Sequence, residues 1–294
     1  MSVVESLHRM GGVATRRQLV QVAGRPAVEE AIRDGDITNV ARGRYALATA
    51  DDAIVAAHRL CGVASHASAA LRHGWQVKTS PELPHVAVAK NRVLTEGQAA
   101  GVELHRLTLG PDDVDGLVTS KQRTLLDCLR VGPFDEGLCI ADSALRDGFS
   151  PQLLAAIARD ARGPGSIQVR EIARHADGRS ANAFESTLRA ICLAVPGLCV
   201  TPQLSLYGSS FLGRPDLVDE RLGILLEADS FEWHGERAAL CRDARRYNRF
   251  VVNGWLVLRF SWEDVMFHPD EVRRVLEAAV AERTERQCRC RVPA

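Results

Sequence analysis

The sequence predicts a multi-domain α/β protein, and three observations lead to this prediction. The chain of 294 residues is longer than most single domains, and 46% of its residues are hydrophobic, which is enough for more than one core. Helical and strand patterns alternate along most of the chain. Turn signals rich in glycine interrupt the pattern at Gly163–Ser166 and Asp177–Ser180. We expect domains at residues 1–49, 50–177 and 178–286, and a tail at 287–294.

The first 49 residues have the pattern of three helices followed by a hairpin. Thr15 can accept a hydrogen bond from the free N–H groups that begin the second helix, and Gly24 can end that helix. Pro26 suits the first turn of the third helix. Three helices and a hairpin are the arrangement of a winged helix-turn-helix. The expected helices cover residues 3–10, 15–24 and 26–34, and the expected strands cover 37–41 and 44–47.

The next segment, from residue 51 to about residue 176, alternates between helices and strands and predicts a mixed α/β domain. Its histidines include His58, His66, His73 and His85. Their spacing lacks the close pairs typical of metal ligands, so we expect core or surface histidines rather than a metal site. The expected elements are an alanine-rich helix, strands at 84–88 and 102–107, and helices around 123–130 and 135–145.

The remaining residues predict a third domain, in which a sheet is covered by helices. A short helical stretch lies between the two turn signals and precedes this domain. Leu222–Ala228 and Trp255–Phe260 are apolar enough to predict buried strands. The expected elements are a helix at 183–195, strands at 204–207, 215–218 and 222–228, a helix at 238–253, a strand at 255–260 and a helix at 269–283.

Charge and composition exclude some classes of protein. Lys plus Arg and Asp plus Glu each number 37, so binding to a nucleic acid has to depend on local patches rather than on net charge. No apolar run reaches the length of a membrane span, and Met1–Met10 lacks the pattern of a signal peptide. Scattered cysteines predict reduced thiols. We therefore expect a soluble, cytoplasmic protein with no membrane partner.

Two acidic motifs in the last domain indicate chemistry. Arg214-Pro215-Asp216 is followed by Glu227-Ala228-Asp229, in which Glu227 ends an apolar strand. Asp216 belongs to the neighbouring strand, so the carboxylates of Asp216 and Glu227 can converge on one Mg²⁺, which prefers oxygen ligands. Glu227 and Asp229 share one face of an extended strand. The alternative is that Asp216 and Asp219 flank a turn and Glu227 only ends a strand.

Further polar residues around these motifs favour the metal site. Glu185 lies in the preceding helix, and Gln203 opens the next strand. His234 follows the acidic pair. Asp243 and Arg246 have the i, i+3 spacing at which helical side chains can pair.

Residues 183 to 265 resemble the uncharacterised relatives of the very-short-patch repair endonuclease, members of the PD-(D/E)XK nuclease superfamily. The resemblance implies a restriction-endonuclease-like α/β/α sandwich. It rests on an ordered series of polar and aromatic positions, followed by a strand that begins with glycine. The matching positions are Glu185, Gln203, Asp216, Glu227, Asp229, His234, Asp243, Arg246, Gly254, Val257, Arg259 and Phe260.

The resemblance implies a role for each of these positions. Mg²⁺ or Mn²⁺ would be held by Asp216, Glu227 and Asp229. Glu185 would complete the catalytic set, and His234 would be a general base or a phosphate contact. The other roles are DNA contact for Gln203 and a structural role for Asp243, Arg246 and Arg259.

One departure concerns the lysine that usually follows the acidic pair in this superfamily. The chain has no lysine beyond Lys121, and Asp229 stands at that place. Activation of water would then depend on the metal, on His234, or on a second ion held by Asp229 and Glu185.

The N-terminal segment resembles the winged helix of AbiEi-type antitoxins, which repress their own promoters. The resemblance rests on Gly12–Leu19 and Arg42–Tyr45, and it continues at Ser65–Ala70 and Thr119–Asp127. It implies DNA as a partner and leaves room for a homodimer or a cognate toxin. The alternative is a winged helix that docks a protein, which Glu29-Glu30 in the third helix favours. The residues expected to contact DNA are Arg16, Arg17, Arg42 and Arg44.

Two hypotheses on function follow from these patterns. The first is a metal-dependent DNA endonuclease that carries its own DNA-binding domain. The second is an antitoxin-like transcriptional regulator whose nuclease fold is inactive. Carboxylates of Asp216 and Glu227 within reach of one ion, about 4 to 5 Å apart, favour the first.

Overall fold

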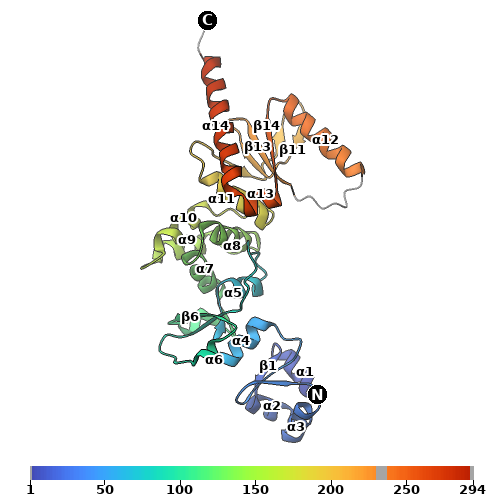
Figure 1. The fold of residues 1–294 in the computed structure, drawn as a ribbon, viewed down its shortest axis with the longest axis vertical. Coiled ribbons are helices and arrows are strands. Elements are labelled where there is room, and N and C mark those ends of the chain that lie inside the picture. Colours follow the sequence, from blue (N-terminus) through green and yellow to red (C-terminus); the bar gives the residue numbers. More distant parts are fainter. Residues whose placement is uncertain (1, 230–236, 292–294) are drawn as a thin grey trace. The chain divides into compact units, whose positions relative to one another are not determined.

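The computed structural model describes residues 2–229 and 237–291, and the chain forms two compact units. Unit 1 contains Met1–Trp75 and Thr79–Cys128, and unit 2 contains Gln76–Lys78 and Leu129–Ala294. Both units combine helices with sheets, so the chain is a multi-domain α/β protein, as the sequence predicts (Figure 1). Unit 2 extends across the predicted boundary between residues 177 and 178. The predicted boundaries stay predictions.

Unit 1 begins with three helices and a three-stranded antiparallel sheet. The Thr15 hydroxyl accepts a hydrogen bond from the Gln18 backbone N–H, and the Gln18 side-chain oxygen accepts one from the Thr15 backbone N–H. This capping box starts the second helix where the sequence predicts it. Strand β1 was not predicted, because its three residues pair only with the distant strand β3. The elements are α1 (Val3–Arg9), β1 (Val13–Thr15), α2 (Arg16–Ala23), α3 (Arg25–Arg33), β2 (Thr38–Ala41) and β3 (Arg44–Ala46).

The rest of unit 1 is built on a five-stranded mixed sheet with the strand order β6-β5-β4-β8-β7. The two longest strands, β5 and β6, are parallel and match the predicted strands. The short strands β4 and β8 were not predicted, because two residues give no periodic pattern. The elements are α4 (Asp52–Leu60), β4 (Val63–Ala64), α5 (His66–Arg72), β5 (His85–Ala89), α6 (Glu96–Ala99), β6 (Glu103–Leu107), η1 (Pro111–Asp113), β7 (Val114–Asp115), β8 (Val118–Thr119) and α7 (Lys121–Arg130), whose last two residues belong to unit 2.

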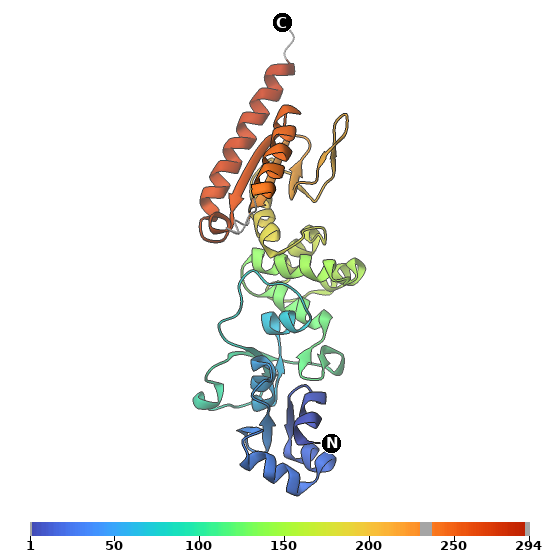
Figure 2. The same ribbon diagram turned by 90° about the vertical axis from the view of Figure 1, so that its right-hand side faces the viewer.

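Unit 2 contains a group of helices followed by a four-stranded sheet with the strand order β14-β13-β12-β9. A separate hairpin, β10–β11, projects beside this sheet (Figure 2). The elements are α8 (Phe134–Arg146), α9 (Pro151–Asp160), α10 (Ser166–His175), α11 (Ala183–Leu193), β9 (Thr201–Pro202), β10 (Leu206–Tyr207), β11 (Phe211–Gly213), β12 (Leu217–Asp219), β13 (Ile224–Asp229), α12 (Arg237–Val252), β14 (Leu256–Ser261), α13 (Trp262–Phe267) and α14 (Pro269–Arg291).

Helices cover both faces of the unit 2 sheet, and strand β13 shows why. Ile224 and Leu226 point to one face, where they pack against α11, α13 and α14. Leu225 points to the opposite face and packs against Phe250 of α12. The side chains of Glu227 and Asp229 follow Leu225 in the alternation, so they lie on the α12 side. In Figure 1 the helices α14 and α12 flank these strands.

Two sequence-based expectations for the unit 2 sheet were wrong. Leu204–Tyr207 was predicted to open the sheet, but its last two residues form β10 of the separate hairpin, and β9 occupies the edge of the sheet. Trp255–Phe260 was predicted to be buried, but residues 255–258 are only half-buried and Arg259 is exposed. The reason is topological, because β14 is an edge strand and pairs only with β13.

A buried ion pair connects α8 and α11 within unit 2. The Asp142 carboxylate is fully buried and accepts hydrogen bonds from the Arg189 guanidinium at 2.6 Å, from Ser186 Oγ at 2.8 Å and from the Asp177 backbone at 2.8 Å. Burial raises the pKa of Asp142, and Arg189 acts against that shift. Both carboxylate oxygens of Asp142, although removed from water, therefore accept hydrogen bonds from protein donors.

In the described part of the chain, we find no helix with the length and apolar character needed to cross a membrane.

Candidate active site

Two carboxyl groups of unit 2 meet at the side chain of Gln203, and a third interacts with one of them. The Gln203 amide nitrogen donates to Glu185 Oε2 at 2.9 Å and to Asp216 Oδ1 at 3.0 Å. Asp216 Oδ2 accepts from the Ala228 backbone at 2.8 Å, which holds this carboxylate against strand β13. Glu227 lies one residue before Ala228, and its carboxyl group is close enough to that of Asp216 for the two to affect each other's pKa. The structure thus brings together four of the residues that the sequence singled out.

Local structure explains how each side chain is placed. Asn182 caps α11 by accepting from the Glu185 backbone at 2.9 Å, which puts Glu185 in the first turn of the helix. The Glu185 carboxylate also accepts from the Ala181 backbone at 2.8 Å. Gln203 follows β9, rather than opening a strand, and has a φ of 52°, an uncommon conformation for a residue other than glycine. Backbone strain of this kind persists where surrounding contacts hold the residue in place. At Gln203 these contacts are the hydrogen bonds of its side chain to Glu185 and Asp216.

The carboxyl groups repel one another in a dry environment. Burial, followed by the charge of Asp216, raises the pKa of Glu227 to about 8. Burial also raises the pKa of Asp216 and that of Glu185, the latter with a smaller contribution from the Asp216 charge. A cation placed between the groups would relieve this repulsion, which is the electrostatic character expected of a metal or catalytic site.

Arginine side chains lie beside the carboxylates on the α12 side of the sheet. Arg246 of α12 approaches Glu227 at 3.6 Å and Asp243 at 3.7 Å, so the predicted pair of Asp243 and Arg246 is present. Arg259 is paired with Asp229 across the two parallel strands. Both guanidinium groups lie over the ring of Tyr247, at 5.0 Å and 4.4 Å from its centre. Tyr247 could not be recognised from the sequence, where its only signal is its place beside Arg246.

The arrangement differs from the predicted three-carboxylate metal site. Asp229 shares a strand face with Glu227, but Arg259 holds its carboxylate. No group of three carboxylates among the described residues has ligand atoms within 4.8 Å of one another. A role for Asp229 as a metal ligand stays a prediction. His234 lies outside the described residues.

The residues present fit a hard divalent cation held chiefly by Asp216 and Glu227. Glu227 Oε1 is buried and has no hydrogen-bond partner among the described residues. This oxygen faces only the Arg246 guanidinium at 3.6 Å, and a carboxylate oxygen without a hydrogen bond beside a second carboxylate is the kind of donor that Mg²⁺ or Mn²⁺ accepts.

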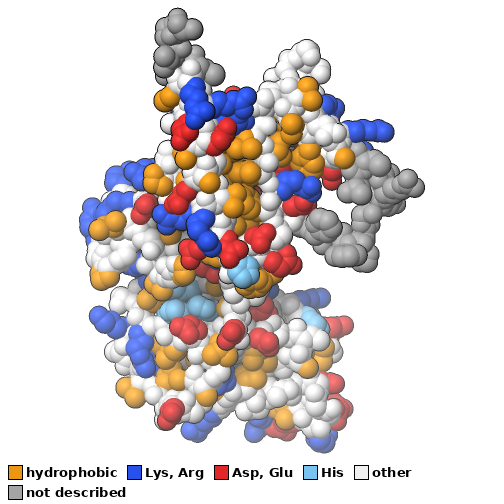
Figure 3. All heavy atoms as spheres, turned by 45° about the horizontal axis from the view of Figure 1, so that its top comes forward, with side chains coloured by type: hydrophobic (Ala, Val, Ile, Leu, Met, Phe, Trp, Pro, Cys, Tyr) orange, Lys and Arg blue, Asp and Glu red, His pale blue; other side chains and the backbone are white. Residues whose placement is uncertain are grey.

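The structure also shows where the predicted DNA contacts of unit 1 lie. Arg17 and Arg42 are exposed. Arg16 is paired with Glu29 at 3.1 Å, and the Arg44 guanidinium lies 3.2 Å from His58 Nδ1. On the face drawn in Figure 3, basic and acidic side chains are interspersed, so neither sign dominates that face. Arg17 and Arg42 are therefore better placed than Arg16 and Arg44 to meet a phosphate.

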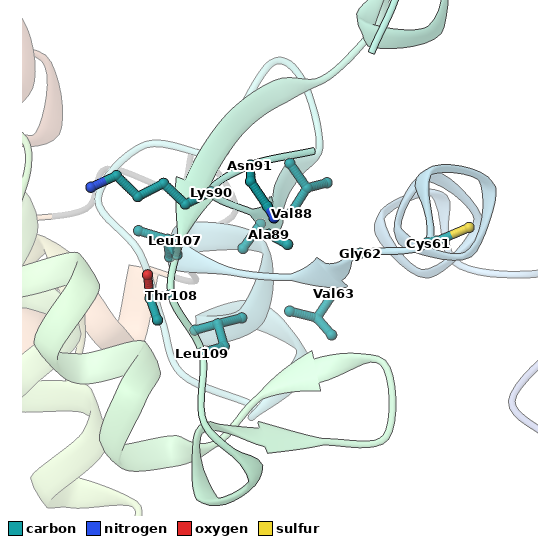
Figure 4. Close-up of a pocket in the computed structure, with 11 residues that line it drawn as sticks. Cys61, Gly62, Val63, Val88, Ala89, Lys90, Asn91, Leu107, Thr108 and Leu109 are labelled. Atoms are coloured by element: carbon teal, nitrogen blue, oxygen red, sulfur yellow. The ribbon is translucent and has the colours of Figure 1, made fainter. Parts of the chain in front are cut away.

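One pocket of the described residues belongs to unit 1 and contains none of the predicted site residues. Its volume is about 750 Å³. The lining combines aliphatic side chains of β4, β5 and β6 with a few polar ones, and Figure 4 shows the Lys90 side chain reaching away from the others. The polar members of the lining are Lys90, Asn91 and Thr108. The lining has no carboxylate or histidine.

We predict that the stability of the metal-free protein falls as pH rises from 6.5 to 8.5. The folded state keeps the Glu227 proton up to about pH 8, whereas an unfolded Glu releases it near 4.5. The resulting stabilisation is full below 4.5 and is lost on passing pH 8. Buried histidines act in the opposite direction, but only below about 6.5.

The measurement is thermal unfolding in EDTA across this pH range. Glu227→Gln should flatten the profile, because the amide does not titrate. Glu220→Gln, at an exposed position, should keep the wild-type profile. A wild-type melting temperature that rises or stays level over this range would show that Glu227 is ionised in the folded protein.

No protein-family model matches the chain. Two uncharacterised proteins of Mycobacterium tuberculosis, MT2308 of strain CDC 1551 and Rv2248 of strain H37Rv, are each 24% identical over 264 residues. The match covers 83% of this chain and 93% of each relative. The crystal structure of the RV2827C protein from the same organism has a TM-score of 0.37 and 17% identity, over 70% of this chain and 87% of that chain. The chain is therefore similar along most of its length to proteins described as uncharacterised.

Proposed function

We propose that the sheet of unit 2 and its flanking helices form a restriction-endonuclease-like domain that hydrolyses DNA with Mg²⁺ or Mn²⁺. The observation that carries the proposal is the cluster of Glu185, Asp216 and Glu227, which stands at one end of the sheet with raised pKa values. Helices α11 and α14 on one face and α12 on the other agree with an α/β/α sandwich. The Asp216 charge raises the pKa of both Glu185 and Glu227, and a cation site brings such repelling carboxyl groups together, whereas a structural ion pair does not require them.

Each residue of the cluster has a task in this proposal. Asp216 and Glu227 would hold the cation, and Gln203 orients Asp216 through its hydrogen bond. The bound ion would supply a Lewis acid for the phosphate and lower the pKa of a water molecule. Arg246 faces Glu227 from α12 and can contact a phosphate oxygen, since a guanidinium matches that geometry. Glu185 is placed to accept a proton or to contact a water molecule.

A second candidate function is that of a transcriptional regulator with an inactive nuclease fold. Two observations favour it. Arg259 forms an ion pair with the Asp229 carboxylate, and the chain has no lysine beyond Lys121. In this reading the acidic cluster has a structural role, and the protein acts through DNA binding alone. A cognate toxin or a second copy of the chain would be the protein partner.

Both candidates use residues 1–49 as a winged helix-turn-helix that binds DNA. Three helices, the antiparallel sheet and the exposed Arg42 at the β2–β3 turn support this part of the proposal. Glu29 and Glu30 are exposed on α3, the helix that would enter the major groove, and they weigh against tight base contact. Phosphate contacts from Arg17 and Arg42 would then supply most of the affinity.

We predict that the full chain binds duplex DNA with an affinity that falls steeply with salt. Each phosphate contact contributes about 0.9 to the slope of log K against log salt concentration. The double variant Arg17→Ala/Arg42→Ala should therefore lower the slope by about 2. The measurement is fluorescence anisotropy from 50 to about 200 mM salt, the range over which such contacts are lost.

Arg159→Ala is the matched control, because Arg159 is an exposed arginine of unit 2. It should leave the slope unchanged. Binding that is independent of salt, or equal slopes for the double variant and the wild type, would contradict the assigned contacts.

A nicking assay decides between the two candidate functions. Supercoiled plasmid is incubated with the full chain and Mg²⁺ or Mn²⁺, and a parallel reaction contains EDTA. The endonuclease proposal expects open-circular or linear product only with the metal. If the plasmid stays supercoiled both with and without metal, and the chain binds DNA, the regulator is favoured.

A further inference from the structure

Three histidines of unit 1 come together although they lie far apart in the sequence. His66 begins α5, His85 begins β5, and His105 lies in β6. One imidazole nitrogen of each lies within 4.8 Å of a nitrogen of the other two. The His66 and His105 rings stack with centres 3.6 Å apart, and the His85 and His105 centres are 5.1 Å apart. This is the one group of three or more potential metal ligands found among the described residues.

The backbone holds the three rings in place. Residues 85–89 pair in parallel with residues 103–107, and the Ser68 hydroxyl accepts from the His85 backbone at 2.9 Å. His66 is buried and has a φ of 48°, a conformation that is uncommon for residues other than glycine. Packing alone does not require a buried imidazole with a strained backbone at this position. An aliphatic side chain would fill the same space without burying a polar ring.

The hydrogen bonds of the cluster leave ligand nitrogens available. His66 Nδ1 lies 3.0 Å from Ser65 Oγ, so Nε2 is free to face a metal, and such a second hydrogen bond typically fixes the tautomer of a ligating histidine. His85 Nδ1 lies 2.9 Å from His105 Nε2, so one proton joins these nitrogens in the metal-free protein. Two imidazole nitrogens on one tetrahedral zinc, with Zn–N bonds of 2.0–2.1 Å, stand about 3.3 Å apart. A small opening of this pair, with the shared proton moving to the other nitrogen of its ring, would admit the ion.

The electrostatic surroundings keep the rings in the ligating form. Burial, followed by the neighbouring histidines, lowers the pKa of His66 to about 3, and burial lowers the pKa of His105 to about 4. Arg123 is the cation that acts on His66, but Asp127 at 2.8 Å and Asp113 at 3.4 Å balance its charge. Burial also lowers the pKa of His85, so it favours the uncharged imidazole, the form that binds a metal, at all three positions.

The geometry points to a transition-metal site formed by His66, His85 and His105, with zinc as the preferred ion. Three imidazole ligands suit zinc and its neighbours in the first transition series, whereas Mg²⁺ requires oxygen ligands. A set of three protein ligands leaves a fourth position for water, as in catalytic rather than structural zinc centres. The site lies in unit 1 and does not depend on the nuclease proposal for unit 2.

Cobalt and zinc binding to the untagged, EDTA-treated full chain tests this site. We expect one equivalent of Co²⁺ to bind with visible absorption of tetrahedral coordination, and one equivalent of Zn²⁺ to displace it. His66→Ala, His85→Asn and His105→Asn should each weaken binding by more than about tenfold, the least that loss of a supporting hydrogen bond to a ligand causes. His8→Gln, at an exposed position, should bind as the wild type does.

X-ray absorption at the zinc edge of the wild-type protein gives a second measurement that needs no variant to fold. The site predicts scattering from three imidazole rings. The inference would be overturned by a wild-type chain that binds neither ion, by coordination through oxygen alone, or by equal binding in all three histidine variants.

Discussion

Asp216→Asn and Glu227→Gln are expected to abolish metal-dependent nicking by the full chain. Each substitution removes one charged oxygen ligand from the site at which Glu227 Oε1 has no hydrogen-bond partner among the described residues. Loss of one hydrogen-bond donor to the transition state typically reduces the rate by about 10²–10³. Loss of a metal ligand also displaces the ion, so we expect the nicking rate to fall about 10³-fold or more. His234→Ala is expected to reduce the rate without abolishing it, because the cation would stay bound.

The same variants should change stability in the opposite direction in EDTA. Glu227→Gln removes a buried charge that Asp216 repels, so its melting temperature at pH 8.5 should exceed that of the wild type. Mg²⁺ should stabilise only the wild type, by about 2.7 kcal/mol at a concentration 100 times the Kd. A variant that loses activity while gaining metal-free stability cannot have lost activity through unfolding.

Glu220→Gln serves as the matched control for this experiment. It removes one exposed carboxylate in the turn between β12 and β13 and should leave both nicking and the Mg²⁺ effect unchanged. Full nicking by Asp216→Asn would place the active site elsewhere. A wild-type chain with neither metal stabilisation nor nicking would favour the regulator.

Arg189→Met is expected to lower the free energy of unfolding of unit 2 by about 3–5 kcal/mol. The methionine removes the charge that balances Asp142, whose carboxyl group is fully buried. Asp142 then has to take up a proton or remain as an unpaired ion, and both states are unfavourable in a dry core. Urea unfolding followed by tryptophan fluorescence measures the effect, since Trp255 and Trp262 belong to unit 2.

Two further variants separate the charge from the packing of the side chain. Arg159→Met removes a guanidinium from an exposed pair with Asp160 and should not change stability measurably. Asp142→Asn/Arg189→Met removes both charges and keeps an acceptor for the Asp177 backbone, so it should lose less stability than Arg189→Met alone. Equal losses in the single and double variants would show that packing, not charge, determines the effect.

Much of the fold could be predicted from the sequence, because most of its helices and its longer strands have local causes. Thr15 and Asn182 start helices through hydrogen bonds to residues three positions away, and Gly24 ends one with a φ of 80°. The alternation of Leu225 and Leu226 predicts a strand buried on both faces. Edge position and the pairing of two-residue strands depend on distant segments, which is why β14 was wrongly expected to be buried and β4 was missed.

Four residues of the candidate active site were brought together as the sequence suggested, but the contacts that each of them makes could not be predicted. The order of Glu185, Gln203, Asp216 and Glu227 along the chain pointed to one site, and the structure places them together. The ion pair between Asp229 and Arg259 was not predictable, because it depends on the register of the parallel strands β13 and β14. Residue type alone cannot specify which of several carboxylates meets a cation.

The histidine cluster marks the limit of what the sequence by itself determined. The sequence determined most of the helices, the longer strands and the acidic motifs, since each depends on neighbours a few residues apart. Only the tertiary structure decided that His85 and His105, 20 residues apart, would share a proton, and that His66 would stack on them. The physical reason is that side-chain clusters of this kind arise from strand pairing and helix packing, and no spacing along the chain encodes them.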